Sequence, residues 1–199
     1  MNIQSSSDVY IPAFNEACSG FEAMLLKYIC VAGCTWPGIL FHDDRKCADY
    51  LLSRNDVDTS RIGCCGLSIG GYRSAFLAAL DARIKCGVVT DWMPTMDSLL
   101  DNKLAIHTYM VYVPLLARYM DLPDVVSLAT PNAIMVQQCT KDPLYHLYGM
   151  VDAVKHIQNV YETIGCPDQF KGVFYDTNHQ FNVQMQEDAF TWFDEKLKS

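Results

Sequence analysis

One short segment of the sequence carries residue types that suit nucleophilic catalysis. The segment is Gly66-Leu67-Ser68-Ile69-Gly70, and Gly71 follows it directly. A serine hydroxyl can attack a carbonyl carbon when it stands on a tight turn between a strand and a helix, because the turn exposes its oxygen. Small flanking residues let the strand and the helix approach each other there. The spacing therefore predicts a nucleophilic Ser68, with the N–H of Ile69 donating to the developing oxyanion.

A serine nucleophile needs a base, and a histidine later in the chain is the expected one. Four histidines follow Ser68, and His179 comes soon after an apolar, strand-like run at 170–175. Catalytic groups gather in loops at the carboxyl ends of parallel strands. We therefore predict that His179 is the general base. Of the other three, we expect His156 in the middle of a helix, His146 at a helix start or in a loop, and His107 in an inserted segment.

The histidine needs a carboxylate to orient it, and two aspartates follow strand-like runs. Asp142 comes after the run 133–139, whereas Asp91 comes directly after the run 84–90. Each could instead serve a helix cap or a turn. We favour Asp142, because the order serine, aspartate, histidine then gives one strand end to each residue. Asp91 remains the rival.

Apolar runs alternate with helical patterns along the chain, an order typical of a parallel sheet with helices on both faces. We expect strands at 9–11, 61–66, 84–90, 133–139 and 170–175, and helices at 43–54, 71–80, 148–164 and 182–197. A segment rich in Leu, Met and Tyr interrupts this order, and we expect it to form helices over one end of the sheet. The sequence therefore predicts one α/β domain over residues 1–199, with a helical insertion at about 96–130.

Composition narrows the kind of protein further. The 199 residues are 50% hydrophobic and 19% charged, which excludes a disordered chain and allows a sizeable core. A net charge of −8 argues against nucleic-acid binding. The first residues do not resemble a signal peptide, and no apolar run reaches the length of a membrane span, so we expect no membrane association.

The nine cysteines are scattered, and no two are spaced as a CxxC pair. This pattern does not fit a disulfide framework or a zinc site, so we expect a reducing, cytoplasmic location. The segment His42-Asp43-Asp44 resembles a metal site but fits the beginning of a helix better, since acidic groups complement the helix dipole. We expect no metal and no other cofactor.

The three candidate segments resemble the catalytic blocks of α/β-hydrolases of the dienelactone hydrolase and acetyl xylan esterase-like group. The resemblance covers roughly residues 30–197, and its blocks are 66–71, 140–144 and 178–182. It implies an α/β-hydrolase fold and a serine esterase acting on small-molecule esters, acetylated sugars among them. In that role Ser68 is the nucleophile, His179 the base and then the acid, and Asp142 its orienting partner. Leu67 and Trp92 are expected to line the substrate site.

The chain departs from that group before the serine. Only 67 residues precede Ser68, where the group usually has about three more strands and a His-Gly loop that supplies a second oxyanion N–H. This sequence contains no His-Gly pair. Either another N–H substitutes, from residues 13–16 or from a partner chain, or the protein is a shortened esterase with weakened activity. A shortened sheet would also expose an edge, which predicts a homo-oligomer.

Two other functions stay open. Gly70-Gly71-Tyr72 also resembles serine peptidases of the prolyl oligopeptidase group, which predicts cleavage after Pro or Ala. A chain that keeps the three catalytic residues without a complete oxyanion hole would instead be a non-catalytic scaffold. Covalent labelling of Ser68 separates that scaffold from both enzymes.

Overall fold

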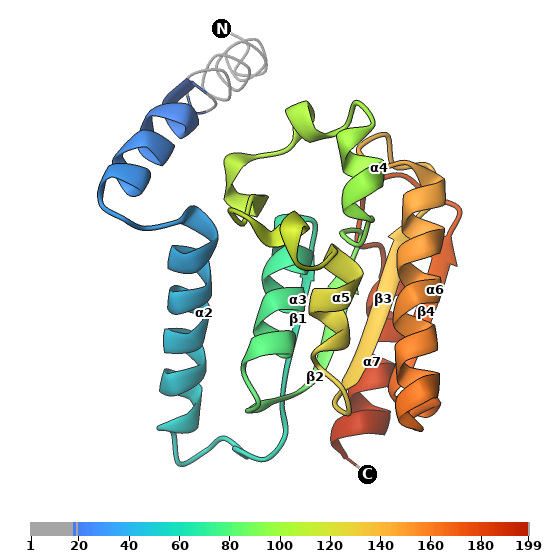
Figure 1. The fold of residues 1–199 in the computed structure, drawn as a ribbon. Helices are drawn as coiled ribbons and strands as arrows, with labels where there is room; N and C mark the ends of the chain where they lie inside the picture. The colour runs from blue at the N-terminus through green and yellow to red at the C-terminus, as the bar shows by residue number, and fades with distance from the viewer. Residues whose placement is uncertain (1–17, 19, 199) are drawn as a thin grey trace, which may run out of the picture.

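The computed structural model describes residue 18 and residues 20–198, and a parallel sheet lies at its centre (Figure 1). Its four strands neighbour one another in chain order, and each neighbouring pair is parallel. They are β1 (Ile62–Leu67), β2 (Ile84–Thr90), β3 (Ala133–Cys139) and β4 (Phe170–Tyr175). The predicted parallel sheet is confirmed, whereas the strand predicted at 9–11 lies outside the described residues.

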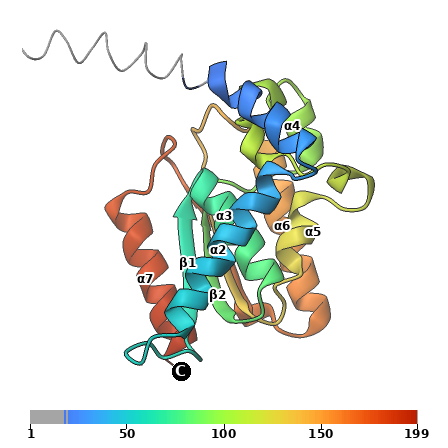
Figure 2. The ribbon, with the colours of Figure 1, turned by 90° about the vertical axis from the view of Figure 1, so that its left-hand side faces the viewer.

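Helices cover both faces of this sheet. One face carries α3 (Ile69–Leu80), α5 (Leu122–Ser127) and α6 (Leu147–Ile164), and the other carries α7 (Val183–Leu197). Figure 2 shows α7 on the opposite side of the strands from α3 and α6. The helix α2 (Trp36–Leu52) packs on α3 rather than on the strands.

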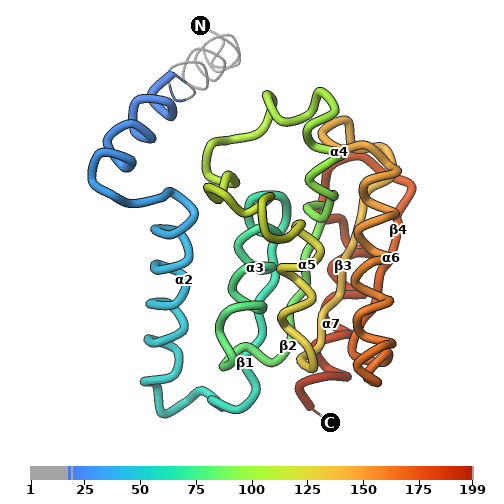
Figure 3. The backbone as a smooth tube through the Cα atoms, in the orientation of Figure 1, coloured from blue at the N-terminus to red at the C-terminus, as the bar shows by residue number. Residues whose placement is uncertain are grey.

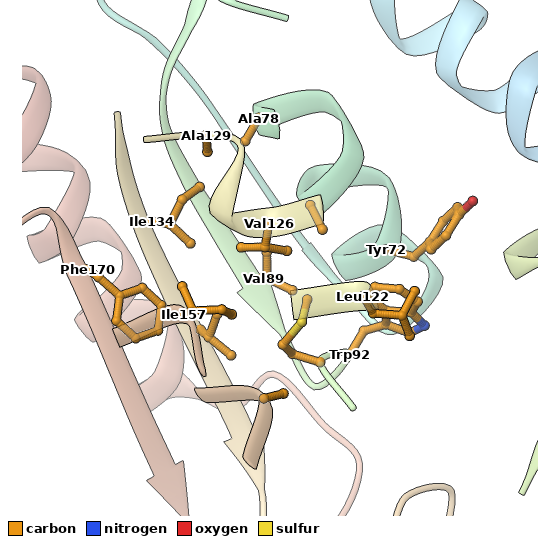
Figure 4. Close-up of a cluster of buried hydrophobic side chains, with 14 of the residues drawn as sticks. Tyr72, Ala78, Val89, Trp92, Leu122, Val126, Ala129, Ile134, Ile157 and Phe170 are labelled. Atoms are coloured by element: carbon orange, nitrogen blue, oxygen red, sulfur yellow. The ribbon is translucent and has the colours of Figure 1, made fainter. Parts of the chain in front are cut away.

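The two central strands, β2 and β3, are buried almost throughout because their alternate side chains enter two separate cores. Val89 of β2 belongs to the larger core under α3, α5 and α6, and Ile134, Ile157 and Phe170 fill the same core (Figure 4). The next residue back, Val88, enters the smaller core against Trp192 of α7. Because side chains alternate across a strand, a run apolar at every position indicates a strand buried on both faces.

Local caps explain where the helices begin and end. The Thr35 side chain accepts a hydrogen bond from the Gly38 N–H at 3.1 Å, so α2 begins at Trp36 rather than at the predicted residue 43. Asn182 caps α7 in the same way, through the N–H of Met185 at 3.0 Å. Gly165 ends α6 with a φ of 83°.

The segment between β2 and β3 consists of short helical turns (Figure 3). In order they are α4 (Met96–Leu100), η1 (Leu104–Ile106), η2 (Tyr109–Val111), η3 (Leu116–Arg118) and α5. Most of this segment lies at the end of the sheet toward which the strands run (Figure 1). An earlier helix, Gly20–Val31, contacts it where Thr108 donates a hydrogen bond to the Glu22 carboxylate.

No single helix within residues 20–198 is both long enough and apolar enough to cross a membrane. The helices Gly20–Val31 and Trp36–Leu52 reach the required length and composition only together, and they are bent by 84° at the break between them.

Candidate active site

Ser68 occupies a strained turn between β1 and α3. Its φ of 59° and ψ of −120° lie in a region that residues other than glycine rarely adopt. The Ser68 N–H donates to the carbonyl oxygen of Thr90 at 2.9 Å, and the Ser68 carbonyl accepts the Tyr72 N–H at 2.9 Å. Both bonds fix the turn to its surroundings, as a positioned nucleophile requires.

Two glycines make this turn sterically possible. A Cβ added to Gly66 would lie 2.3 Å from the backbone carbon of Gly70. A Cβ added to Gly71 would lie 2.7 Å from the Thr90 carbonyl oxygen. The strand and the helix therefore meet at distances that no side chain tolerates, which is the close approach expected from the sequence.

Ile69 is the first residue of α3, so its N–H has no acceptor within the helix. The positive end of the helix dipole lies at the same place. An oxyanion formed on a substrate carbonyl at Ser68 would be stabilised there. The segment 13–16, expected to supply a second donor, lies outside the described residues.

His179 lies in the loop after β4, and its ring is held by Asp142. The Nδ1 atom of His179 lies 2.7 Å from the Asp142 Oδ2. The other carboxylate oxygen, Oδ1, accepts the N–H of Leu144 at 2.8 Å. A donor at Nδ1 leaves the opposite ring nitrogen, Nε2, free to accept a proton. This pair is the one predicted from the sequence.

The rival aspartate contacts the same nitrogen. Asp91 Oδ2 lies 2.8 Å from His179 Nδ1, and its Oδ1 accepts the N–H of Cys139 at 3.1 Å. The ends of β2 and β3 therefore bring both aspartates to one histidine. Both carboxylates are fully buried.

Their charge changes the protonation of the histidine. The hydrogen bond to Asp142, and then the close contact with Asp91, raise the pKa of His179 to about 9 against the opposing effect of burial. Burial also raises the pKa of Asp142, but the hydrogen bonds from His179 and Leu144 outweigh it and leave the pKa below its usual value. At neutral pH, therefore, both ring nitrogens of His179 carry a proton and the imidazole ring is positively charged.

The same three residues place one nitrogen and two oxygens within 4.8 Å of one another, a spacing that metal sites share. The separations of 2.7 and 2.8 Å are those of hydrogen bonds, and they suit a histidine oriented by carboxylates. No hydrogen bond joins Ser68 to His179 within residues 20–198.

The two residues predicted beside the substrate have different surroundings. Leu67 ends β1 opposite Thr90 and is half-buried. Trp92 is only 3% exposed and stands edge-on to Tyr72, with ring centres 4.8 Å apart, inside the larger core (Figure 4). It lies in the core because its backbone follows β2 directly beneath α3. This placement gives no support to a role in contacting substrate.

A hollow of about 720 Å³ lies beside the inserted segment. His107, Tyr109, Tyr112 and Glu22 are among the residues that line it. The His107 ring stacks on Tyr145 at 5.0 Å, and burial lowers the pKa of this histidine. The sequence does not predict this hollow, because three short 3₁₀ turns have no periodic pattern.

Comparison with known proteins identifies the family to which the chain belongs. A model of the family described as the prolyl oligopeptidase family matches residues 35–199. The chain belongs to this family. It is 30% identical over 161 residues to a protein of Bacillus subtilis (strain 168) named "Putative hydrolase YtaP". That match covers 79% of this chain and 53% of the relative, so the chain spans about half of that protein's length.

Solved structures share the α/β-hydrolase fold of this prolyl oligopeptidase family member. A glucuronoyl esterase of Caldicellulosiruptor kristjansonii matches with a TM-score of 0.65 and 13% identity, over 79% of this chain and 49% of the other. A Bacteroides fragilis NCTC 9343 protein described as a putative acetyl xylan esterase matches with a TM-score of 0.66 and 18% identity, over 77% and 40%. The fold expected from the sequence is confirmed.

Proposed function

We propose that this chain is a serine hydrolase of carboxylic esters that forms an acyl-enzyme on Ser68. Two observations on one fold carry the proposal: a serine with a φ of 59° on a strand–helix turn, and a histidine held at Nδ1 by a buried carboxylate. A hydroxyl becomes nucleophilic when a positioned base takes its proton, and these residues supply both parts.

The reaction follows from these roles. His179 Nε2 takes the Ser68 proton as the serine oxygen bonds to the ester carbon, and the carbonyl electron pair moves to oxygen. When that pair returns, the bond to the alcohol breaks and the alcohol leaves with the proton from His179. A water molecule then attacks the acyl-enzyme, giving its proton to His179, and Ser68 regains a proton as the acid leaves.

Small acyl esters, acetylated sugars among them, are the proposed substrates. The fold is shared with proteins described as esterases of carbohydrates, which supports this class without identifying the ester. The hollow bordered by Tyr109 and Tyr112 offers aromatic and polar surface of the kind that binds sugars. A cytoplasmic location belongs to the proposal as well, and all nine cysteines being free supports it.

The test uses p-nitrophenyl acetate and a fluorophosphonate probe with the chain of residues 1–199. We expect ester hydrolysis and a single covalent adduct on Ser68, both lost in Ser68→Ala. Hydrolysis that persists in Ser68→Ala would remove Ser68 from the mechanism. A chain with neither turnover nor an adduct would be the non-catalytic scaffold.

Membership of the prolyl oligopeptidase family favours a second candidate, a serine peptidase. The same Ser68 and His179 would then cleave amides after Pro or Ala. Matched Ala and Pro substrates, each made as a p-nitrophenyl ester and as an anilide, separate the two functions. Our proposal expects turnover of the esters only, whereas efficient turnover of the anilides would favour the peptidase.

A further inference from the structure

Two carboxylates from different strands converge on one atom of His179. Asp142 Oδ2 and Asp91 Oδ2 lie 2.7 and 2.8 Å from Nδ1, so neither contact is appreciably longer than the other. A single orienting acid would be enough for the proposed mechanism. The mechanism therefore does not account for the second carboxylate, that of Asp91.

The backbone builds Asp91 into this position. Its N–H donates to the Gln137 carbonyl at 2.7 Å, and its Oδ1 accepts the Cys139 N–H at 3.1 Å. Asp91 also has a φ of 50°, a left-handed conformation that few residues other than glycine, asparagine and aspartate adopt. These contacts leave Oδ2 facing the histidine.

His179 is the only basic partner that Asp91 Oδ2 has among the described residues. This oxygen is buried and makes no hydrogen bond that meets strict geometry. Asp142 also faces this pair, with a carboxylate oxygen within 4.8 Å of one from Asp91. The other titratable groups facing the pair are Cys139, Tyr145 and His107. Burial raises the pKa of the thiol to about 12, raises that of the phenol further, and lowers that of His107, so all three are neutral at pH 7. A buried anion without a partner is costly, so this carboxylate and His179 stabilise each other.

We propose that Asp91 is a second positioning residue for His179, so that either carboxylate alone keeps the imidazole in the tautomer that leaves Nε2 free. The inference rests on the proposed hydrolase function, in which Nε2 accepts the serine proton. In a site with one acid, changing that acid to asparagine turns the imidazole to the wrong tautomer and costs about 10⁴-fold in kcat. With two acids, the remaining carboxylate keeps the imidazole in place.

The experiment compares Asp142→Asn, Asp91→Asn and the double variant in ester hydrolysis. Asparagine keeps the Oδ1 acceptor for the Leu144 and Cys139 N–H groups, and it tolerates the left-handed backbone at residue 91. We expect each single variant to lose less than about 30-fold in kcat/KM and the double variant to lose about 10⁴-fold. If Asp142→Asn alone falls as far as the double variant, Asp91 does not position the base.

The pH profile separates positioning from a structural role. Each single variant removes one anion from Nδ1, so we expect the apparent pKa of kcat/KM to fall below that of the unaltered chain in both. An Asp91→Asn profile identical to that of the unaltered chain would overturn the inference. Thermal unfolding of the three variants checks that their folds persist.

A readout without turnover keeps this inference separate from the proposed function. Imidazole titration by NMR follows His179 whether or not any ester is hydrolysed. We expect its pKa to decrease in Asp91→Asn and, independently, in Asp142→Asn. If Asp91→Asn leaves the His179 pKa unchanged, Asp91 does not position the base. If both variants lower the His179 pKa but no ester is hydrolysed, only the proposed function is refuted.

Discussion

The N–H of Ser68 donates to the carbonyl oxygen of Thr90 at 2.9 Å, which continues the pairing of β1 with β2 past the end of β1. The serine is thus held by the strand that leads directly into Asp91. One element therefore fixes both the proposed nucleophile and an acid that contacts its base. Disturbing the contact between α3 and Thr90 should affect the whole site.

Gly71→Ala tests that contact. Its Cβ would lie 2.7 Å from the Thr90 carbonyl oxygen and 3.1 Å from the Trp92 Cβ, and backbone atoms have little room to move away. We expect destabilisation of at least about 2 kcal/mol, the size of an overpacked core, and ester turnover reduced by more than about 10-fold. Urea unfolding and p-nitrophenyl acetate hydrolysis measure the two effects.

Gly70→Ala is the matched control for stability. A Cβ at Gly70 meets no atom within 4 Å, and alanine suits a helix better than glycine. We expect its unfolding free energy to be unchanged or raised by up to about 1 kcal/mol. Equal destabilisation by the two substitutions would show that the close approach at Thr90 is unimportant.

Ester hydrolysis should increase with pH into the alkaline range. A base must be neutral to accept the serine proton, and the hydrogen bond to Asp142 and the contact with Asp91 raise the pKa of His179 to about 9. We therefore expect kcat/KM to rise toward a plateau above pH 9, with turnover at pH 7 about 100-fold below that plateau. Initial rates in buffers of constant ionic strength give the profile.

The exposed His156 on α6 provides the control for that profile. It pairs with Asp124 at 2.7 Å and lies in a helix that carries none of the three proposed catalytic residues. His156→Gln should leave the pH range over which kcat/KM rises unchanged. A profile that levels off near pH 6.5 in the unaltered chain would mean that the carboxylates do not hold a proton on His179.

Most of the fold could be predicted from local pattern. The sequence predicts the strands β2, β3 and β4 at their observed bounds, because each is a short, mainly apolar run between polar turns. The start of α2 was missed, although Thr35 followed by a proline at position 37 is a helix-start pattern. The short turns of the inserted segment have no period from which they could be predicted.

The candidate site was predictable up to the choice of acid. Chain order identified Ser68 and His179, because each follows its own strand. It could not decide between Asp91 and Asp142, since the carboxyl ends of parallel strands meet at one edge of the sheet. Only the packed structure, with both oxygens within 2.8 Å of one nitrogen, removes the choice. The burial of Trp92 likewise depends on tertiary packing that its sequence neighbours do not reveal.

Arg83 links α2 to the turn before β2 and should contribute to stability. It donates to the buried Asp81 from Nε at 2.7 Å and from Nη2 at 2.5 Å, and to Asp49 of α2 from Nη1 at 2.6 Å. Arg83→Ala leaves the Asp81 carboxylate with the backbone N–H of residue 83 at 3.2 Å and a partial partner in Arg45 at 3.5 Å. We expect a loss of about 1–2 kcal/mol in unfolding free energy, reduced from the value of a fully buried pair because Arg83 is partly exposed.

Lys46→Ala is the comparison for Arg83→Ala, since Lys46 contacts Asp49 at 3.0 Å on the exposed side of α2. Exposed pairs contribute little, so its effect on the unfolding free energy should be much smaller than that of Arg83→Ala. The pKa of Asp81 is lowered by its hydrogen bond to Arg83, so the Arg83 contribution should be present at neutral pH and disappear as Asp81 is protonated in acid. An Arg83→Ala effect that is the same at pH 7 and pH 3 would contradict this account.

The free edge of β1 should pair with a second copy of the chain. In the described sheet β1 has a neighbour only on its β2 side, and an edge of unpaired backbone groups promotes association. Multi-angle light scattering should give a mass above 22.4 kDa that falls on dilution. Backbone hydrogen exchange in Ile62–Leu67 should slow as concentration rises, whereas exchange in Phe170–Tyr175, at the other edge, should not change. A monomeric mass at all concentrations, or concentration-dependent protection only in β4, would exclude pairing through β1.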